Sequence, residues 1–389
     1  MIYDYRTYLI NKNKASIKQK IEEFSGKQSE WKSWIEKKLT PILWTQKKDN
    51  WYDNFTLLSL LSSFWGDKDS KKETIKAIKT VYRYKLGHKT GYEVPPESWN
   101  WIESLADVPP KNINDFPKGS WLIHFTFRLE KPYLSRDDTD FYIIDNPVKK
   151  EWVFKVPYVA SSQWKGALRA AMMQELVFGL QDNGNEGEFL DKRVQLWRIF
   201  GNERDGAETF LNMALARYRS GEEPQDEKQY KEWRKCLDDE ARKVGEHFFN
   251  ILNEKKLRKE NIEGFRGSLF FYPTYFNMIG LEVINPHSRK TGSGTQPIYF
   301  ECVPEKTNGE FCVLYVPFVY ATAEDCLDDL KAVVYGIISM MTTYGFGAKT
   351  SSGFGVTVFP FQKVFVKASG DEMQEVASAM VDLLSGDGS

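Results

Sequence analysis

The sequence predicts an α+β fold in which an antiparallel sheet carries helices. A strand pattern begins abruptly after residue 119: in "SWLIHFTFRLEKPYL", apolar residues such as Ile123 and Phe125 alternate with residues such as His124 and Thr126. Helical patterns separate further strand patterns along the chain. With 389 residues, of which 41% are hydrophobic and 15% aromatic, the chain is large enough to bury a sizeable core.

The first helix of this core is expected at "SSQWKGALRAAMMQELVFGL". Ser161 or Ser162 is a suitable N-cap, because a serine hydroxyl accepts a hydrogen bond from the first turn. Apolar residues then recur at helical spacing and define one buried face. These residues are Trp164, Leu168, Met172 and Leu176.

Strands are predicted next at "FRGSLFFYPTYF", in "GLEVINPHSRKTGSGTQPIYFECVP", which gives strand, loop and strand, and at "GEFCVLYVPFVYA". A second helical pattern and a final strand follow them. The resulting order, β-α-β-β-β-α-β, is typical of a ferredoxin-like or RRM-type antiparallel sheet with helices. His124 is interpreted as a core or edge histidine. The aromatics Phe270, Phe271, Tyr272 and Tyr275 are candidates for base stacking, although we expect at least half of them to be buried.

The chain divides into three parts. Residues 1–118 are predicted to be a helical N-terminal extension, and residues 119–368 the sheet-containing core. A charged helical insertion at 205–263 interrupts the core, and a Gly/Asn/Asp/Glu-rich loop is expected at 181–191. Residues 369–389 are expected to be a flexible tail.

Charge and cysteine usage narrow the functional class. The net charge of −1 excludes a bulk polycation, so any contact with nucleic acid must come from local basic patches. Two windows, 330–370 and 152–174, contain lysine or arginine but no Asp or Glu. The four cysteines form no C-x-x-C pair, and no zinc-site spacing is present. We expect a cytoplasmic protein without membrane contact, since no signal-peptide pattern or long apolar run is visible.

Four glycines, three hydroxyls and one lysine crowd into "YGFGAKTSSGFG" (344–355). A Walker A loop is excluded because Ala348 precedes Lys349-Thr350. A dinucleotide fingerprint is excluded because Thr350 stands where the third glycine belongs, and because a helix precedes the loop and a strand follows it. Exposed backbone N–H groups can hold anions, and glycine permits close approach of another backbone. A helix C-cap followed by a turn is the alternative.

Three segments together carry a resemblance to a known family. "IIDNPVKKEWVFKVPYVASSQWKGALR", "RIFGN" followed by "RGSLFFYPTYF", and the glycine-rich loop resemble, in the same order, motifs of the RAMP superfamily of CRISPR proteins. The resemblance covers about residues 120–360. This chain departs from the family motifs at three places. Ala160 stands where the family usually has glycine before the two serines, Gln163-Trp164 stand where it has Leu or Ile after them, and Pro273 stands where an acidic residue is common.

The resemblance implies a backbone subunit of a type III CRISPR effector, a ribonucleoprotein of antiviral defense. Such a subunit binds guide CRISPR RNA, contacts target RNA and other effector subunits, and acts as an endoribonuclease on the paired target RNA. Asp145 matches the catalytic aspartate, which is expected to work with Mg²⁺ or Mn²⁺ and is itself a possible metal ligand. The alternative for Asp145-Asn146-Pro147 is an ordinary Asx turn.

The remaining candidate residues are expected to contact guide RNA. A helix start with hydroxyls and cations suits a phosphate, which singles out Ser161, Ser162, Lys165 and Arg169. A small basic loop adds His287, Arg289 and Lys290. The glycine-rich loop adds Gly345, Gly347, Lys349, Thr350, Ser351, Gly353 and Gly355.

Three other functions stay open at this point. A non-catalytic subunit that caps the guide RNA 3′ end is favoured by the His287 segment and opposed by Asp145. A repeat-processing endonuclease would need a histidine, and His124 is the only one near the expected position. A purely structural scaffold would use the glycine loop as a turn.

Overall fold

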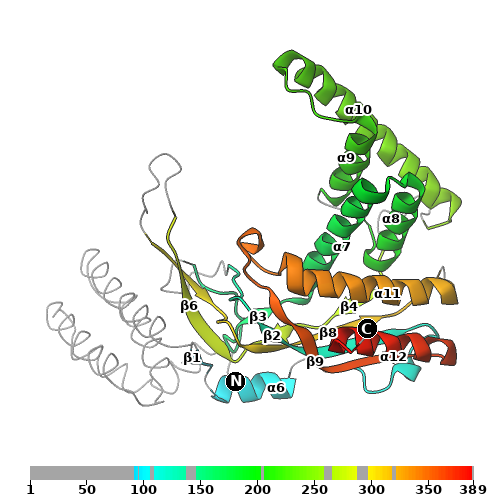
Figure 1. The fold of residues 1–389 in the computed structure, drawn as a ribbon. Helices are drawn as coiled ribbons and strands as arrows, with labels where there is room; N and C mark the ends of the chain where they lie inside the picture. Colours follow the sequence, from blue (N-terminus) through cyan, green and yellow to red (C-terminus); the bar gives the residue numbers. More distant parts are fainter. Residues whose placement is uncertain are drawn as a thin grey trace.

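The computed structural model shows a sheet-and-helix core with helical and ribbon-like projections (Figure 1). Helices and strands are described here for residues 92–94, 96–105, 109–136, 146–202, 206–257, 265–286, 297–317 and 321–387. Residues 1–91, which make up most of the predicted N-terminal extension, lie outside the described part of the chain.

The central sheet has four strands in the order β4-β8-β2-β9. They are β2 (Trp121–Leu129), β4 (Leu269–Phe271), β8 (Asn308–Tyr315) and β9 (Thr357–Ala368). All three pairings are antiparallel. Helix α7 (Ser161–Asn183) connects β2 towards β4, and α11 (Ala323–Ser339) connects β8 to β9. The predicted ferredoxin-like α+β fold is therefore confirmed.

One face of this sheet forms the core beneath the helices. The alternating residues Trp121, Ile123, Phe125, Phe127 and Leu129 of β2 are all at most 1% exposed. They join the buried residues of α7 and α11 in one hydrophobic cluster. The predicted apolar face of α7 is likewise buried, so the alternation in the sequence correctly identified the inner face of the sheet.

The two core helices begin in different ways. At α11, the Thr322 hydroxyl accepts from the Asp325 N–H at 3.1 Å, and the Asp325 carboxylate accepts from the Thr322 N–H at 2.9 Å, which forms a capping box. At α7, the expected serine cap is wrong: Ala160 occupies the cap position, and Ser161 and Ser162 are the first two helical residues. The Gln163 side chain accepts from the Ala160 N–H at 3.4 Å instead.

The C-terminal residues also differ from expectation. Residues 371–385 form α12 (Asp371–Ser385) rather than a flexible tail. Its apolar side, including Met373, Ala377 and Leu384, is buried in the core cluster, and the helix packs along β9. Burial of this apolar side stabilises the helix. The prediction of a flexible tail had depended on the small polar residues at the very end of the sequence.

Three further helices follow α7, and the last two of them extend away from the sheet (Figure 1). They are α8 (Glu186–Phe200), α9 (Ala207–Ser220) and α10 (Glu227–Glu254). The prediction of a loop at 181–191 is wrong, because α7 continues to Asn183 and α8 begins at Glu186. Gly184 turns the chain with φ +64°, and the Asn185 side chain caps α8 by accepting from the Glu188 N–H at 3.1 Å.

A second, three-stranded sheet projects beside the glycine loop (Figure 1). Its order is β1-β6-β7, with β1 (Tyr92–Glu93), β6 (Met278–Ile284) and β7 (Ile298–Cys302). Strand β1 comes from the part expected to be helical. It is followed by α6 (Pro96–Leu105) and the short helix η1 (Ile113–Asp115). Two short strands, β3 (Tyr158–Val159) and β5 (Thr274–Tyr275), pair with each other.

Candidate nucleic-acid-binding surface

The base of the glycine loop is closed by its own backbone. After α11, the π-helical turn Met340–Tyr344 ends at Gly345 with φ +73°. The Phe346 N–H donates to the Gly355 carbonyl at 3.0 Å, and a Cβ at Gly355 would collide with the Phe346 carbonyl. A Cβ at Gly347 would collide with the Leu134 carbonyl. These glycines therefore permit close backbone approach, but the approaching backbone belongs to the same chain.

The tip of the loop is arranged differently, because it faces outward. Lys349, Ser351 and Gly353 are exposed, whereas Thr350 is half-buried. Gly353 has φ +81° with no heavy atom near the position of a Cβ. The ammonium group of Lys349 lies 5.1 Å from the ring centre of Phe300 on β7, which brings the tip beside the projecting sheet. The tip thus offers hydroxyls, a cation and bare backbone to a ligand.

The loop is fixed against the start of α7 through a buried aromatic side chain. Phe346 is 1% exposed, and its ring centre lies 4.4 Å from that of Trp164 in the first turn of α7. The Trp164 indole N–H donates to the Thr274 hydroxyl at 3.0 Å. Because of this packing, the predicted candidates Ser161 and Ser162 and the glycine loop belong to the same part of the molecule. The first N–H groups of a helix lack intrahelical acceptors and carry a partial positive charge.

Tyr133 contacts both the glycine loop and the start of α7. Its ring centre lies 5.6 Å from that of Phe346, and its hydroxyl is 3.2 Å from the Gln163 side-chain oxygen. Burial raises the pKa of Tyr133 to about 12, so the phenol stays neutral at ordinary pH. The Ala348 N–H donates to the Leu134 carbonyl at 2.7 Å, which ties the loop to the segment that follows β2.

A cluster of cations lies further along α7. Burial lowers the pKa of Lys165, and the nearby positive charges of Arg169 and Arg266 lower it further. The Arg266 guanidinium also lies over the Phe270 ring, 4.5 Å from its centre. These three positive charges create a positive potential, which a bound anion would neutralise. Arg169 also borders a hollow between α7 and α9, so the cations extend away from the glycine loop along the helix.

The segment after Asp145 is held rigidly against β7. The Glu301 carboxylate accepts from the Val148 N–H at 3.1 Å and forms a buried ion pair with Lys150. The Asn146 side chain donates to the Tyr299 carbonyl at 3.0 Å. Residues 146–150 therefore have a fixed position although most of the segment has no regular secondary structure.

Four of the predicted candidates, Asp145, His287, Arg289 and Lys290, lie outside the described residues. Within the described ranges, no three His, Cys, Asp or Glu side chains gather as metal ligands would. In the same ranges, no helix combines the length and the apolarity required to cross a membrane.

The residues that assemble this surface carry no recognisable signal in the sequence. Phe346 was visible as one aromatic between two glycines, but nothing in the pattern indicated that it enters the core. Lys150 and Glu301 pair across a large sequence separation, and no local signal links them. Tyr133 follows Lys131-Pro132, and the proline indicates only the end of the strand.

A match to a protein-family model identifies the family of this chain. The model of the RAMP superfamily matches residues 140–358, which is more than half of the chain. This chain belongs to the RAMP superfamily. The matched region contains the start of α7, the cation cluster and the glycine loop, so the RAMP core and the surface described above coincide. The resemblance of the three sequence motifs is therefore confirmed at the level of the superfamily.

Two solved structures are similar in shape to this RAMP-superfamily chain. One is from the cryo-EM structure of the Type III-B Cmr-beta bound to cognate target RNA, with 14% identity, a TM-score of 0.40, and coverage of 80% of this chain and 82% of that chain. The other is Cmr6 from Pyrococcus furiosus, with 14% identity, a TM-score of 0.28, and coverage of 61% of this chain and 98% of that chain. No curated protein matches the sequence.

Proposed function

We propose that this RAMP-superfamily protein is an RNA-binding subunit of a type III CRISPR effector, in which the glycine-loop tip and the start of α7 hold the guide RNA backbone. The observation that carries the proposal is the packing of the glycine loop, whose tip is exposed, against the first turn of α7 through Phe346 and Trp164. The tip adds a lysine and hydroxyls, and α7 adds the N–H groups of its first turn, which carry a partial positive charge. None of these groups reads bases, which suits a subunit that binds guides of any sequence.

The cations on α7 support the same path. Arg169 and Arg266 lie close enough to Lys165 to lower its pKa, and the positive potential of the three cations favours a phosphate. Because the chain has a net charge of −1, this local cluster rather than overall charge would supply the attraction. The other subunits of the effector are the proposed protein partners.

We further propose that Asp145 cleaves the paired target RNA with Mg²⁺ or Mn²⁺. The support is the match of Asp145-Asn146-Pro147 to the family motif and the fixed position of the residues that follow it. The Glu301 carboxylate and the Tyr299 carbonyl hold Val148 and Asn146 against β7. A bound divalent cation would stabilise the charge on the scissile phosphate.

RNA content is the first test of this function. The full-length protein is purified, and its nucleic acid is extracted and sequenced. We expect a small RNA that carries repeat-derived sequence and is protected from nuclease. Protein free of RNA that also fails to bind added guide RNA at low salt would contradict the proposal.

Cleavage by Asp145 is tested separately, in the assembled effector with Mg²⁺ present. Asp145→Ala is expected to leave assembly and target binding intact while one set of cuts disappears. Asp182→Ala, an exposed aspartate near the end of α7, is the matched control and should cut normally. Normal cutting by Asp145→Ala would refute the catalytic assignment and favour the non-catalytic capping subunit.

A further inference from the structure

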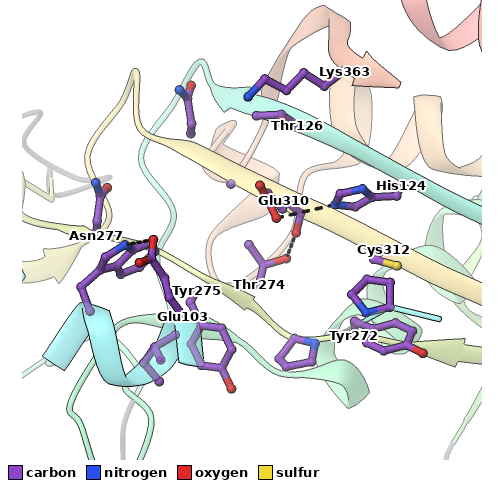
Figure 2. A pocket seen from close by; sticks show the side chains of 16 residues that line it. Glu103, His124, Thr126, Tyr272, Thr274, Tyr275, Asn277, Glu310, Cys312 and Lys363 are labelled. Carbon is purple, nitrogen blue, oxygen red and sulfur yellow. Dashed lines mark hydrogen bonds and ion pairs between the residues drawn. The ribbon is translucent and has the colours of Figure 1, made fainter. Parts of the chain in front are cut away.

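The face of the central sheet opposite α7 and α11 is only partly covered. Strand register places His124 of β2 beside Cys312 of β8 and Phe365 of β9, so these side chains share that face. Ile113 packs on Cys312 at one end. In Figure 1, α6 and α11 lie on opposite sides of the central strands. Between α6 and the open part of the sheet is a cleft of about 480 Å³ (Figure 2).

This sheet-face cleft combines an aromatic wall with hydrogen-bonding groups. Tyr272 supplies a ring, and His124 and Thr126 supply polar groups from β2 (Figure 2). Two carboxylates also line it, Glu103 from α6 and Glu310 from β8. A phosphate would be repelled by these acids, whereas a flat polar ring would find both stacking and hydrogen-bond partners.

The Glu310 carboxylate is held in its charged form. Its oxygen lies 3.6 Å from His124 Nε2. The neighbouring His124 lowers the pKa of Glu310, and the positive charge of Lys363 contributes in the same direction. A charged carboxylate on an open sheet face is a hydrogen-bond acceptor for an amino group.

Lys363 reaches the cleft through a distortion of the edge strand. The pairing of β2 with β9 is irregular between His124 and Thr126, and Lys363 has φ +50° there. A left-handed backbone is unfavourable for a non-glycine residue. Bulges redirect side chains, and this one directs the Lys363 ammonium to the rim of the cleft (Figure 2).

An aromatic platform continues from the cleft across β9. Phe365 is 51% exposed, and its ring stacks beside that of His124 with centres 6.3 Å apart and planes at 13°. Lys367 and Arg128 are exposed on the same face. Aromatic rings flanked by cations match a single strand of nucleic acid, because bases stack on the rings and phosphates pair with the cations.

We infer that the sheet-face cleft binds a nucleobase of single-stranded RNA, and that the strand continues over Phe365 with its phosphates towards Lys363, Lys367 and Arg128. The base has an exocyclic amino group that donates to Glu310, which favours cytosine, adenine or guanine over uracil. This site goes beyond the proposed guide-backbone surface, since it lies on the other side of the sheet and reads base identity.

Affinity measurements test the inference on the full-length protein. The probes are fluorescent single-stranded oligocytidylate and oligouridylate of about 10 nucleotides. Phe365→Ala is expected to weaken both by about fivefold or more, because loss of one stacked base costs about 1–3 kcal/mol. Glu310→Gln is expected to abolish the preference for cytidine. Tyr335→Ala, which removes a 59% exposed aromatic from α11, is the matched control and should change neither affinity.

Equal binding of both probes by wild type, Phe365→Ala and Glu310→Gln would overturn the inference. Photocross-linking with thiouridine-containing RNA separates this result from the proposed function. Cross-links to β2 and β9 support the sheet-face site even if the glycine loop shows none. Cross-links restricted to residues 344–355 would refute the sheet-face site while the proposed function stands.

Discussion

The rings of Trp164 and Phe346 lie with their centres 4.4 Å apart, and this contact joins the first turn of α7 to the glycine loop. Trp164 is fixed in turn by its hydrogen bond to Thr274. The exposed loop tip is therefore not a free turn, because a buried side chain within the loop anchors it to the sheet-and-helix core. Disturbing the anchor should affect both stability and RNA binding.

Phe346→Ala tests the anchor. Because Phe346 is 1% exposed, its removal leaves a cavity and should lower the free energy of unfolding by about 3–5 kcal/mol. Urea unfolding gives the change, and the same variant should bind RNA more weakly. The control Tyr335→Ala, on an exposed ring, should change stability by less than about 0.5 kcal/mol. Equal losses in the two variants would contradict the anchor.

The glycines of the loop should differ in their tolerance of alanine. Gly353→Ala places a Cβ in open space, so its cost is the left-handed backbone alone, about 1–2 kcal/mol. Gly355→Ala adds a collision with the Phe346 carbonyl and should cost clearly more. Thermal unfolding of both variants decides the matter. A Gly355→Ala protein as stable as Gly353→Ala would show that the loop base is not closed as described.

The fold was largely predictable, because it depends on local periodicity. The alternation in β2 and the helical spacing of α7 each reported one buried face, and the order of elements then indicated the topology. Helix α12 and the start of α8 were not predicted. Burial of Leu384 against the core and capping by Asn185 decide these segments, and sequence composition had favoured loops there.

Prediction of the candidate site was less complete. The glycine loop and the serines of α7 were identified by composition, and the structure brings them together. The contact that joins them is Phe346 with Trp164, and the ion pair that fixes residues 146–150 is Lys150 with Glu301. Both join residues far apart in sequence. Such pairs leave no periodic signal. The separate roles of Gly353 and Gly355 likewise depend on what surrounds each residue.

Burial of Tyr133 should make the stability of the protein fall at alkaline pH. Its pKa in the folded protein is raised to about 12, whereas an unfolded tyrosine titrates near 10. Tyr133 therefore contributes stability below pH 10, and this contribution is lost as pH rises from about 10 to 12, by up to about 2 kcal/mol. Tyr133→Phe should lose stability less steeply over this range in urea unfolding. Parallel curves for the two proteins would be inconsistent with a buried neutral phenol.

The four cysteines should react unequally. Burial raises the pKa of Cys302, Cys312 and Cys326, which suppresses their thiolates, whereas Cys236 is exposed on α10. A thiol-specific chromogenic reagent should therefore titrate Cys236 rapidly in the native protein and the other three after unfolding. Cys236→Ser should remove the fast phase. A fast phase that persists in this variant would show that another cysteine is accessible.

The central claim, that the glycine-loop tip holds an RNA backbone, is tested most directly by the salt dependence of guide RNA affinity. Lys349 and Lys256 are both exposed lysines with left-handed backbones, at φ 60° and 57°, so Lys256→Ala is a matched control for Lys349→Ala. Loss of one phosphate contact should reduce the slope of log affinity against log salt by about 0.7–0.9 in Lys349→Ala. Lys256→Ala should keep the wild-type slope. Identical slopes for wild type and both variants would contradict the claim.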